Sequence, residues 1–251
     1  MTDPSAFRKR KKNGQGLFGK GKSQLARPSG RVHLLTLDQQ ASPISEMYRA
    51  IRTNIQSMSL YLPPIKTLVI TSSGPGEGKS TISANLGIVF AQSGHRVLLV
   101  DADLRKPTVH QTFHLENGQG LSRILAKGYG LKDEVQATYV ENLMILTSGP
   151  SPTNPSELLS SSVMDELIET ARGSYDVVLF DMPPLVWVAD SQIMAGKVDG
   201  TLLIVREQVS RKEDLIRAKQ LLELVQARVL GVVYNGSRAV PDSAYHYLFD
   251  R

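Results

Sequence analysis

Short apolar runs alternate with longer helical patterns from residue 67 to residue 235. Several of these runs are almost continuous Val, Leu and Ile, which is typical of strands that are buried on both faces of a parallel sheet. Strands are predicted at 67–72, 97–101, 143–147, 176–181, 201–206 and 229–235. Helices are predicted between them at 79–93, 121–127, 163–172 and 211–226. This alternation favours a three-layer α/β fold with a mainly parallel central sheet.

A further helix is predicted ahead of the first strand. Ser42 precedes Pro43, an order typical of an N-cap followed by the first helical position. One face of this helix is expected to be buried, because apolar residues recur on it at helical spacing: Ile44, Met47, Tyr48, Ile51, Ile55 and Met58. Pro63 and Pro64 end the unit. Residues 32–38 are expected to form a short strand or an extended lead-in.

The positive charge of the chain is concentrated at its N-terminus. Residues 1–31 hold nine Lys and Arg against one acidic residue, and because the whole chain carries +5, the remainder carries −3. We predict that this basic tail is disordered and solvated, with contact to the anionic inner face of a membrane as the alternative. Only Phe7 and Phe18 interleave its charges, so specific nucleic-acid binding is not expected.

The composition limits the function classes. The 251 residues, 41% of them apolar, suit one domain with tails and a substantial core. The chain contains no cysteine, which excludes disulfides and thiol catalysis and fits a reducing cytoplasm. No stretch approaches the roughly 18–20 uninterrupted apolar residues of a membrane span.

A small-residue loop follows the first predicted strand and leads into a helix. In such a loop the backbone N–H groups converge on phosphates, and the helix N-terminus adds positive potential. We expect Lys79 to reach the β- and γ-phosphates of ATP and the Ser80 hydroxyl to ligate Mg²⁺. An ordinary glycine-rich turn is the alternative, and Ser73 departs from the glycine of the strict motif. The predicted nucleotide-binding residues are Ser73, Gly74, Pro75, Gly76, Glu77, Gly78, Lys79, Ser80 and Thr81.

Three carboxylates follow two other buried strands. Asp101 and Asp103 come at the end of one, and Asp181 ends the other. Ligands of an open parallel sheet bind beyond the carboxyl ends of its strands, so these carboxylates are expected near Lys79 and Ser80. They are candidates for holding Mg²⁺ and for accepting a proton from an attacking hydroxyl. For Asp103, capping of a local turn is the alternative.

Several separated motifs resemble the bacterial tyrosine kinase family of capsule and exopolysaccharide systems. The resemblance covers about residues 42–236 and includes the phosphate loop, the acidic segment that ends in Leu104 and Arg105, and the segment 179–184. The segments 154–159 and 231–235 are also similar to the family, and the latter implies that Asn235 hydrogen-bonds the adenine base. The helix around 46–54 resembles the ExxRxxR helix of the family.

The resemblance implies an activity and an assembly. The activity is ATP- and Mg²⁺-dependent phosphorylation of tyrosine on the C-terminal segment of a neighbouring copy, here at Tyr245 or Tyr247. These tyrosines could equally pack on the domain. The assembly is a ring, an octamer in the family, with Glu46, Arg49 and Arg52 at the contact between copies. Helix geometry alone favours a solvated face for these three residues.

The resemblance also implies a division of the chain and a cellular setting. Residues 1–31 form the basic tail, 32–238 the P-loop kinase domain with an oligomerisation helix at 42–60, and 239–251 a short mobile segment that bears the tyrosines. The expected partners are a transmembrane polysaccharide chain-length regulator, which activates the kinase, and a tyrosine phosphatase. The expected location is the cytoplasm, at the inner face of the cell membrane.

Two other functions share this nucleotide chemistry. One is an ATPase switch of the ParA/MinD kind, which has a second signature lysine near the start of the loop, where this chain has Gly74. The other is a scaffold that binds ATP and organises polysaccharide export. The complete set of a loop lysine, a loop serine and three aspartates favours the kinase over the scaffold.

Overall fold

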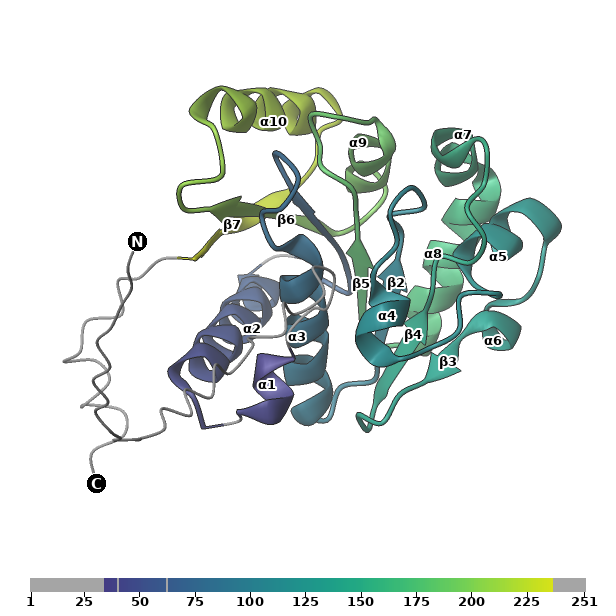
Figure 1. Ribbon diagram of the computed structural model, residues 1–251, viewed down its shortest axis with the longest axis horizontal. Helices are drawn as coiled ribbons and strands as arrows, with labels where there is room; N and C mark the ends of the chain where they lie inside the picture. Colours follow the sequence, from purple (N-terminus) through teal and green to yellow (C-terminus); the bar gives the residue numbers. More distant parts are fainter. Residues whose placement is uncertain (1–33, 40, 62, 237–251) are drawn as a thin grey trace, which may run out of the picture.

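The structure is a computed structural model that describes residues 34–39, 41–61 and 63–236. Within these residues, seven strands form one sheet in the order β3-β4-β2-β5-β1-β6-β7 (Figure 1). All neighbouring strands are parallel except β3 and β4, which confirms the mainly parallel sheet. The strands are β1 (Thr67–Ser72), β2 (Val97–Asp101), β3 (Gln136–Ala137), β4 (Leu143–Leu146), β5 (Val177–Asp181), β6 (Gly200–Arg206) and β7 (Val229–Asn235).

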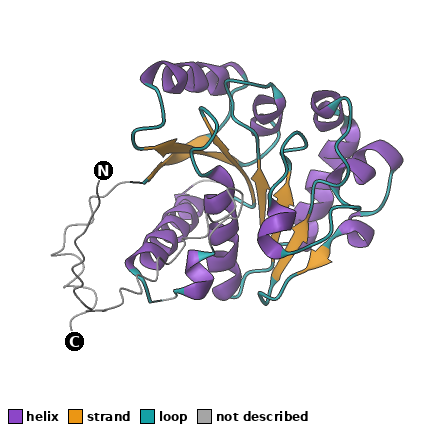
Figure 2. Cartoon of the chain, in the orientation of Figure 1, coloured by secondary structure: helices purple, strands orange, loops and turns teal. Residues whose placement is uncertain are grey.

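Helices cover both faces of the sheet, so the predicted three-layer fold is confirmed (Figure 2). One face packs against α1 (Leu35–Asp38), α2 (Pro43–Tyr61), α3 (Lys79–Gln92) and α4 (Val109–Phe113). The other face packs against α5 (Leu121–Lys127), α6 (Leu131–Glu134), α7 (Pro155–Ser160), α8 (Ser162–Ser174), α9 (Asp190–Ala195) and α10 (Lys212–Leu224).

The central strands are apolar on both faces because each face carries its own core. Successive side chains of a strand point to opposite faces. In β1, Leu68 and Ile70 enter the cluster under α2 and α3, whereas Val69 enters the cluster under α8 and α9. Every residue of β1 is buried. A central strand such as β1 is buried on both faces, so the residues at its centre are apolar in succession and do not alternate with polar ones.

The predicted N-cap of α2 is present. The Ser42 hydroxyl accepts a hydrogen bond from the backbone N–H of Ser45, 3.2 Å away, and Pro43 is the first helical residue. The expected strand or extended lead-in at 32–38 is wrong where the structure describes it, because residues 35–38 form the short helix α1. Thr36 explains the difference: it is buried, and both its backbone N–H and its hydroxyl donate to Asn85 Oδ1 on α3.

The strand order brings the candidate functional segments together. β5 lies between β2 and β1, so the carboxyl ends of these three strands are neighbours. The acidic segment after β2, Asp181 at the end of β5 and the loop after β1 therefore meet at one edge of the sheet (Figure 1). No helix in the described part of the chain is both long enough and apolar enough to cross a bilayer. The predicted tail at 1–31 and the segment 239–251 lie outside the described residues.

Candidate functional site

The loop between β1 and α3 has the strand–loop–helix context that the sequence predicted. Gly78, the last residue before α3, has a φ of 94°, and a Cβ there would lie 2.3 Å from Asn235 Nδ2. The left-handed φ favours glycine at this position, and any larger residue would also displace the Asn235 side chain. Asn235 Nδ2 donates to the carbonyl of Glu77 over 2.9 Å. The structure thus places Asn235 beside the loop, and its adenine contact stays a prediction.

The Glu77 side chain hydrogen-bonds other residues of the same loop. Its carboxylate, 2% exposed, accepts hydrogen bonds from the Ser73 N–H at 3.1 Å, the Ser73 hydroxyl at 2.7 Å and the Gly74 N–H at 3.1 Å. The serine that departs from the strict motif therefore makes, through its hydroxyl, one hydrogen bond to Glu77 that a glycine would lack. The sequence predicted Glu77 as a nucleotide-binding residue, and the structure shows its side chain turned toward the loop itself.

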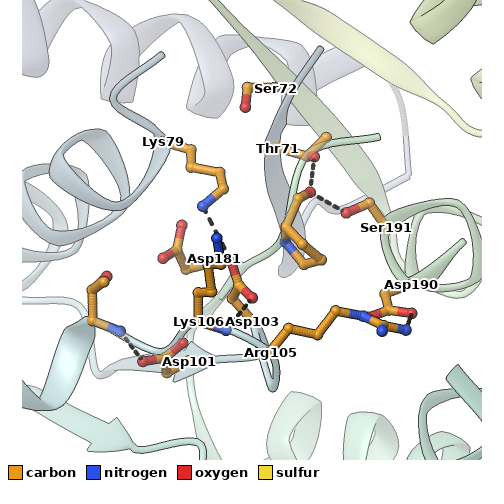
Figure 3. Close-up of polar contacts among 12 residues, drawn as sticks. Thr71, Ser72, Lys79, Asp101, Asp103, Arg105, Lys106, Asp181, Asp190 and Ser191 are labelled. Carbon is orange, nitrogen blue, oxygen red and sulfur yellow. Dashed lines mark hydrogen bonds and ion pairs between the residues drawn. The ribbon is translucent and has the colours of Figure 1, made fainter. Parts of the chain in front are cut away.

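Lys79 and Asp103 face each other across the site (Figure 3). The Lys79 ammonium lies 3.3 Å from Asp103 Oδ2. The other carboxylate oxygen of Asp103 accepts the backbone N–H of Lys106 at 2.9 Å, so Asp103 caps a turn and also pairs with the loop lysine. The ion pair therefore holds the lysine of the loop beside the acidic segment that follows β2.

Asp101 and Asp181 are opposite each other on the paired strands β2 and β5. Asp101 Oδ2 accepts the N–H groups of Thr108 and Val109 at 3.0 and 2.9 Å, and Asp181 Oδ1 accepts the Ser83 hydroxyl at 3.0 Å. Both carboxylates are fully buried. Among the described residues, their remaining oxygens, Asp101 Oδ1 and Asp181 Oδ2, have no hydrogen-bond partner.

Two buried carboxylate oxygens without partners fit a divalent cation, because a buried acceptor is otherwise costly. The Ser80 side chain acts on the same site, because it favours the charged form of Asp181 and so opposes the rise in the pKa of that carboxyl. No cluster of three or more His, Cys, Asp or Glu in the described part of the chain is arranged to hold a metal by itself. Mg²⁺ accommodates such a site, because it takes few protein ligands and completes its shell with water and phosphate oxygens.

The pKa values of Lys79, Asp101 and Asp181 are all raised, by burial or by neighbouring charges. Burial acts to lower the pKa of Lys79, but Asp181, Asp103 and Asp101 outweigh it and raise the pKa above its usual value. Burial raises the pKa of Asp101 to about 8, and Asp181 adds to the rise. Burial also raises the pKa of Asp181 against the opposing effect of Lys79. The lysine therefore stays cationic, and a bound cation would add further positive charge beside Asp101 and Asp181.

Replacing Asp101 with asparagine is expected to stabilise the nucleotide-free protein, and more so at pH 8 than at pH 5.5. The folded-state pKa of Asp101, about 8, lies above its ordinary value of 3.8, so the fold favours the protonated form. The contribution of Asp101 to stability is then complete below pH ~4 and is lost as the pH rises toward 8. Asparagine does not ionise, so the gain should grow by up to ~3 kcal/mol between the two pH values.

Thermal unfolding of both proteins at pH 5.5 and 8 measures this gain as a difference in Tm. A gain of equal size at the two pH values would contradict the prediction, because it would mean that Asp101 ionises in the folded protein as easily as in the unfolded chain.

The three residues predicted at the contact between copies lie on α2. Glu46 and Arg49 form an ion pair on the helix surface. Arg49 and Arg52 line a hollow of about 590 Å³ between α2, the end of α3 and the residues around Tyr139. Arg52 also donates to the carbonyl of Val89 at 3.2 Å. The structure therefore brings the two arginines to one hollow, and their role between copies stays a prediction.

Tyr245 and Tyr247, the predicted phosphoacceptors, lie outside the described residues. The sequence analysis also missed contacts that organise the site. The Arg206 guanidinium donates to the carbonyl of Gly76 at 2.9 Å, and Arg105 binds the buried carboxylate of Asp190. Arg105 stands in the acidic motif and could have been singled out from it, whereas no local signal marks Asp190 or Arg206.

Known proteins share both this fold and this sequence. The family model described as "ParA: NUBPL iron-transfer P-loop NTPase" matches residues 65–250, so the chain is a ParA-like P-loop NTPase. The tyrosine-protein kinase YwqD of Bacillus subtilis is 46% identical over 215 residues, which cover 86% of this chain and 90% of YwqD. The chain belongs to the bacterial tyrosine kinase family.

Other members of the kinase family agree with this assignment. The tyrosine-protein kinase etk of Escherichia coli is 33% identical over 240 residues, which cover 96% of this chain and 32% of etk. The solved kinase domain of E. coli ETK superimposes with a TM-score of 0.78 and 32% identity over 87% of this chain and 86% of that domain. The resemblance that the motifs indicated is therefore confirmed at the level of the family and the fold.

Solved structures outside the tyrosine kinases share the fold of this kinase-family chain. MinD of Pyrococcus horikoshii, complexed with Mg-ADP, has a TM-score of 0.59 and 24% identity, and covers 74% of this chain and 78% of MinD. At this identity the likeness shows the fold alone.

Proposed function

We propose that this protein is a protein-tyrosine autokinase that transfers the γ-phosphoryl group of ATP to Tyr245 and Tyr247 of a neighbouring copy, in exopolysaccharide or capsule production. Membership of the bacterial tyrosine kinase family supports the reaction class. The single observation that carries the site assignment is the convergence of Lys79 on the acidic segment, with its ammonium 3.3 Å from Asp103. Phosphoryl transfer needs this combination of positioning and charge neutralisation.

The residues of the loop bind and orient the nucleotide. The backbone N–H groups of residues 76–81 would face the phosphates, and Lys79 would stabilise charge that grows on the β- and γ-phosphate oxygens. Ser80, Asp101 and Asp181 would hold Mg²⁺ through the hydroxyl and the two unpartnered carboxylate oxygens. When bound, Mg²⁺ would neutralise charge on the β- and γ-phosphate oxygens.

Asp103 is the proposed acceptor of the phenolic proton. In the reaction a bond forms between the tyrosine oxygen and the γ-phosphorus, the bond from that phosphorus to ADP breaks, and the proton passes to the carboxylate. A carboxylate helps because only about a thousandth of tyrosine is ionised at neutral pH. Asp103 is nearer the surface than Asp101, which is fully buried and remains the alternative acceptor.

The proposed assembly is a ring of copies, an octamer by analogy with the family, with Glu46, Arg49 and Arg52 between neighbours. It would carry the segment 239–251 of one copy to the site of the next. The proposed partners are a transmembrane chain-length regulator that activates the kinase at the inner face of the membrane and a phosphatase that reverses its action. The proposed division of the chain places the kinase domain at residues 32–238, between the basic tail and the segment that bears the tyrosines.

Incubation of the purified chain with Mg²⁺ and ATP, followed by mass spectrometry of the C-terminal peptide, tests the proposal. Phosphotyrosine at Tyr245 or Tyr247 is the expected result, with an initial rate that rises faster than linearly with protein concentration, because one copy modifies another. Hydrolysis of ATP with no phosphotyrosine anywhere in the chain would instead support the ATPase-switch function, which the ParA family match keeps as the second candidate.

A further inference from the structure

The first two residues of α9 contact both acidic segments of the site (Figure 3). Asp190 is completely buried. Its carboxylate accepts Arg105 Nε at 2.8 Å and Arg105 Nη2 at 3.1 Å, so the ion pair is bidentate. The hydroxyl of Ser156 on α7 donates to the same carboxylate at 2.5 Å and accepts from Arg105 Nη2 at 3.1 Å. Asp190 thus joins α9, α7 and the segment after β2.

Ser191 holds the segment after β5. Its hydroxyl donates to the carbonyl of Pro183, which also accepts the hydroxyl of Thr71 on β1 at 2.8 Å. Pro183 lies two residues beyond Asp181, and the backbone N–H of Met182 donates to the carbonyl of Ile70. The turn that follows Asp181 is therefore fixed to β1 on one side and to α9 on the other.

The Asp190–Arg105 pair reaches the site through one short turn. Arg105 follows Asp103 by two residues, and Leu104 between them is buried. The turn closes with the hydrogen bond from the Lys106 N–H to Asp103 Oδ1, which leaves Oδ2 facing Lys79. Because Arg105 lies inside this turn, its anchorage to a buried carboxylate fixes where Asp103 stands. Bidentate pairing fixes the guanidinium in direction as well as in distance.

We propose that Asp190 is a positioning residue for phosphoryl transfer, which holds Asp103 opposite Lys79 by anchoring Arg105. This inference rests on the proposed function of the site. Asp190 acts by fixing the position of Asp103, because a small displacement of a group that takes part in phosphoryl transfer lowers the rate by a large factor. Binding of the nucleotide depends mainly on the loop instead. Loss of the anchor therefore lowers kcat and leaves the affinity for ATP nearly unchanged.

A second Arg–Asp pair in the chain provides a matched control. Asp199 pairs with Arg172 at 2.7 Å and also accepts the N–H groups of Lys66 and Thr67, both at 2.9 Å. Asp199 directly precedes β6, so this pair lies at the opposite edge of the sheet from the site. Asp199→Asn is expected to lower the Tm as Asp190→Asn does and to leave kcat unchanged.

The experiment measures kcat and KM for phosphorylation of the C-terminal tyrosines, together with the affinity for a fluorescent ATP analogue. The sole tryptophan, Trp187, serves as the fluorescence energy donor, because it lies close to the phosphate loop. The backbone N–H groups of the two preceding residues, Leu185 and Val186, donate to the carbonyls of Ser72 and Ser73. We expect Asp190→Asn to lower kcat ~10- to 100-fold, with nucleotide affinity within ~3-fold of wild type. Arg105→Lys keeps a positive charge beside the buried carboxylate and is expected to lower kcat in the same way.

A double-mutant cycle with Asp103 separates positioning from general stability. In an Asp103→Asn background, Asp190→Asn should lower kcat by less than ~3-fold, because the group that it positions is already gone. Losses that multiply, or an affinity that falls as much as kcat, would overturn the inference. If Asp190→Asn does not fold, an unchanged kcat in Arg105→Lys overturns it.

A failure of the proposed kinase function can be distinguished from a failure of the inference about Asp190. If the wild-type chain hydrolyses ATP but phosphorylates no tyrosine, the kinase proposal fails. The same cycle, measured on ATP hydrolysis, then decides whether Asp190 positions Asp103.

Discussion

Replacing Lys79 with methionine is expected to reduce tyrosine phosphorylation by ~10³-fold or more. Methionine keeps most of the length of the side chain and removes the charge that stabilises the phosphate oxygens in the transition state. The neighbouring carboxylates raise the pKa of Lys79, so the wild-type ammonium is charged at every pH at which the kinase would be assayed. Phosphate incorporated into the C-terminal peptide, quantified by mass spectrometry over time, measures the effect.

Lys106 provides the matched control for this substitution. Its side chain is exposed, and only its backbone N–H contacts Asp103. Lys106→Met also removes one positive charge close to the site, yet it should keep activity within ~3-fold of wild type, because an exposed charge is screened by solvent. If Lys79→Met retained more than a tenth of wild-type activity, or if both variants lost activity equally, the assigned role of Lys79 would be wrong.

The convergence of the candidate site residues could be predicted from the sequence, because each of these residues ends or follows a fully buried strand. The apolar runs before Ser73, Asp101 and Asp181 identify parallel strands, and the carboxyl ends of parallel strands lie at one edge of a sheet. The convergence of Lys79 on the carboxylates follows from that rule without knowledge of the strand order. The structure adds which carboxylate Lys79 contacts and which carboxylate oxygens have no partner.

The elements that the sequence analysis missed are short. α4, α6, α7 and α9 have four to six residues each, fewer than two turns, so hydrophobic periodicity has no room to show. The helix α1 replaced an expected strand because Thr36 hydrogen-bonds Asn85, 49 residues away. Asp190 is similar: an aspartate in the first turn of a helix looks like a local stabiliser, and its pairing with Arg105, 85 residues away, depends on the completed fold.

Replacing both Tyr245 and Tyr247 with phenylalanine is expected to remove all phosphate from the C-terminal peptide while nucleotide affinity stays within ~2-fold of wild type. Phenylalanine keeps the ring and removes the oxygen that attacks the γ-phosphorus, so no bond to phosphorus can form. The two substitutions change no residue of the phosphate loop and none of the three carboxylates, so nucleotide binding should persist. Mass spectrometry of the peptide and energy transfer from Trp187 to a fluorescent ATP analogue measure the two quantities.

Tyr234 tests whether exposure alone makes a tyrosine a substrate for phosphorylation. It lies on the edge strand β7, is 57% exposed, and is fixed by its place in the sheet. An acceptor must bring its hydroxyl to within bonding distance of the γ-phosphorus on a neighbouring copy, and a residue held in a strand cannot extend to do so. Tyr234→Phe should therefore leave total phosphotyrosine unchanged. Phosphate that survives the double substitution but disappears with Tyr234→Phe would move the acceptor from the C-terminal segment to the sheet edge, and the proposed transfer to Tyr245 and Tyr247 would be wrong.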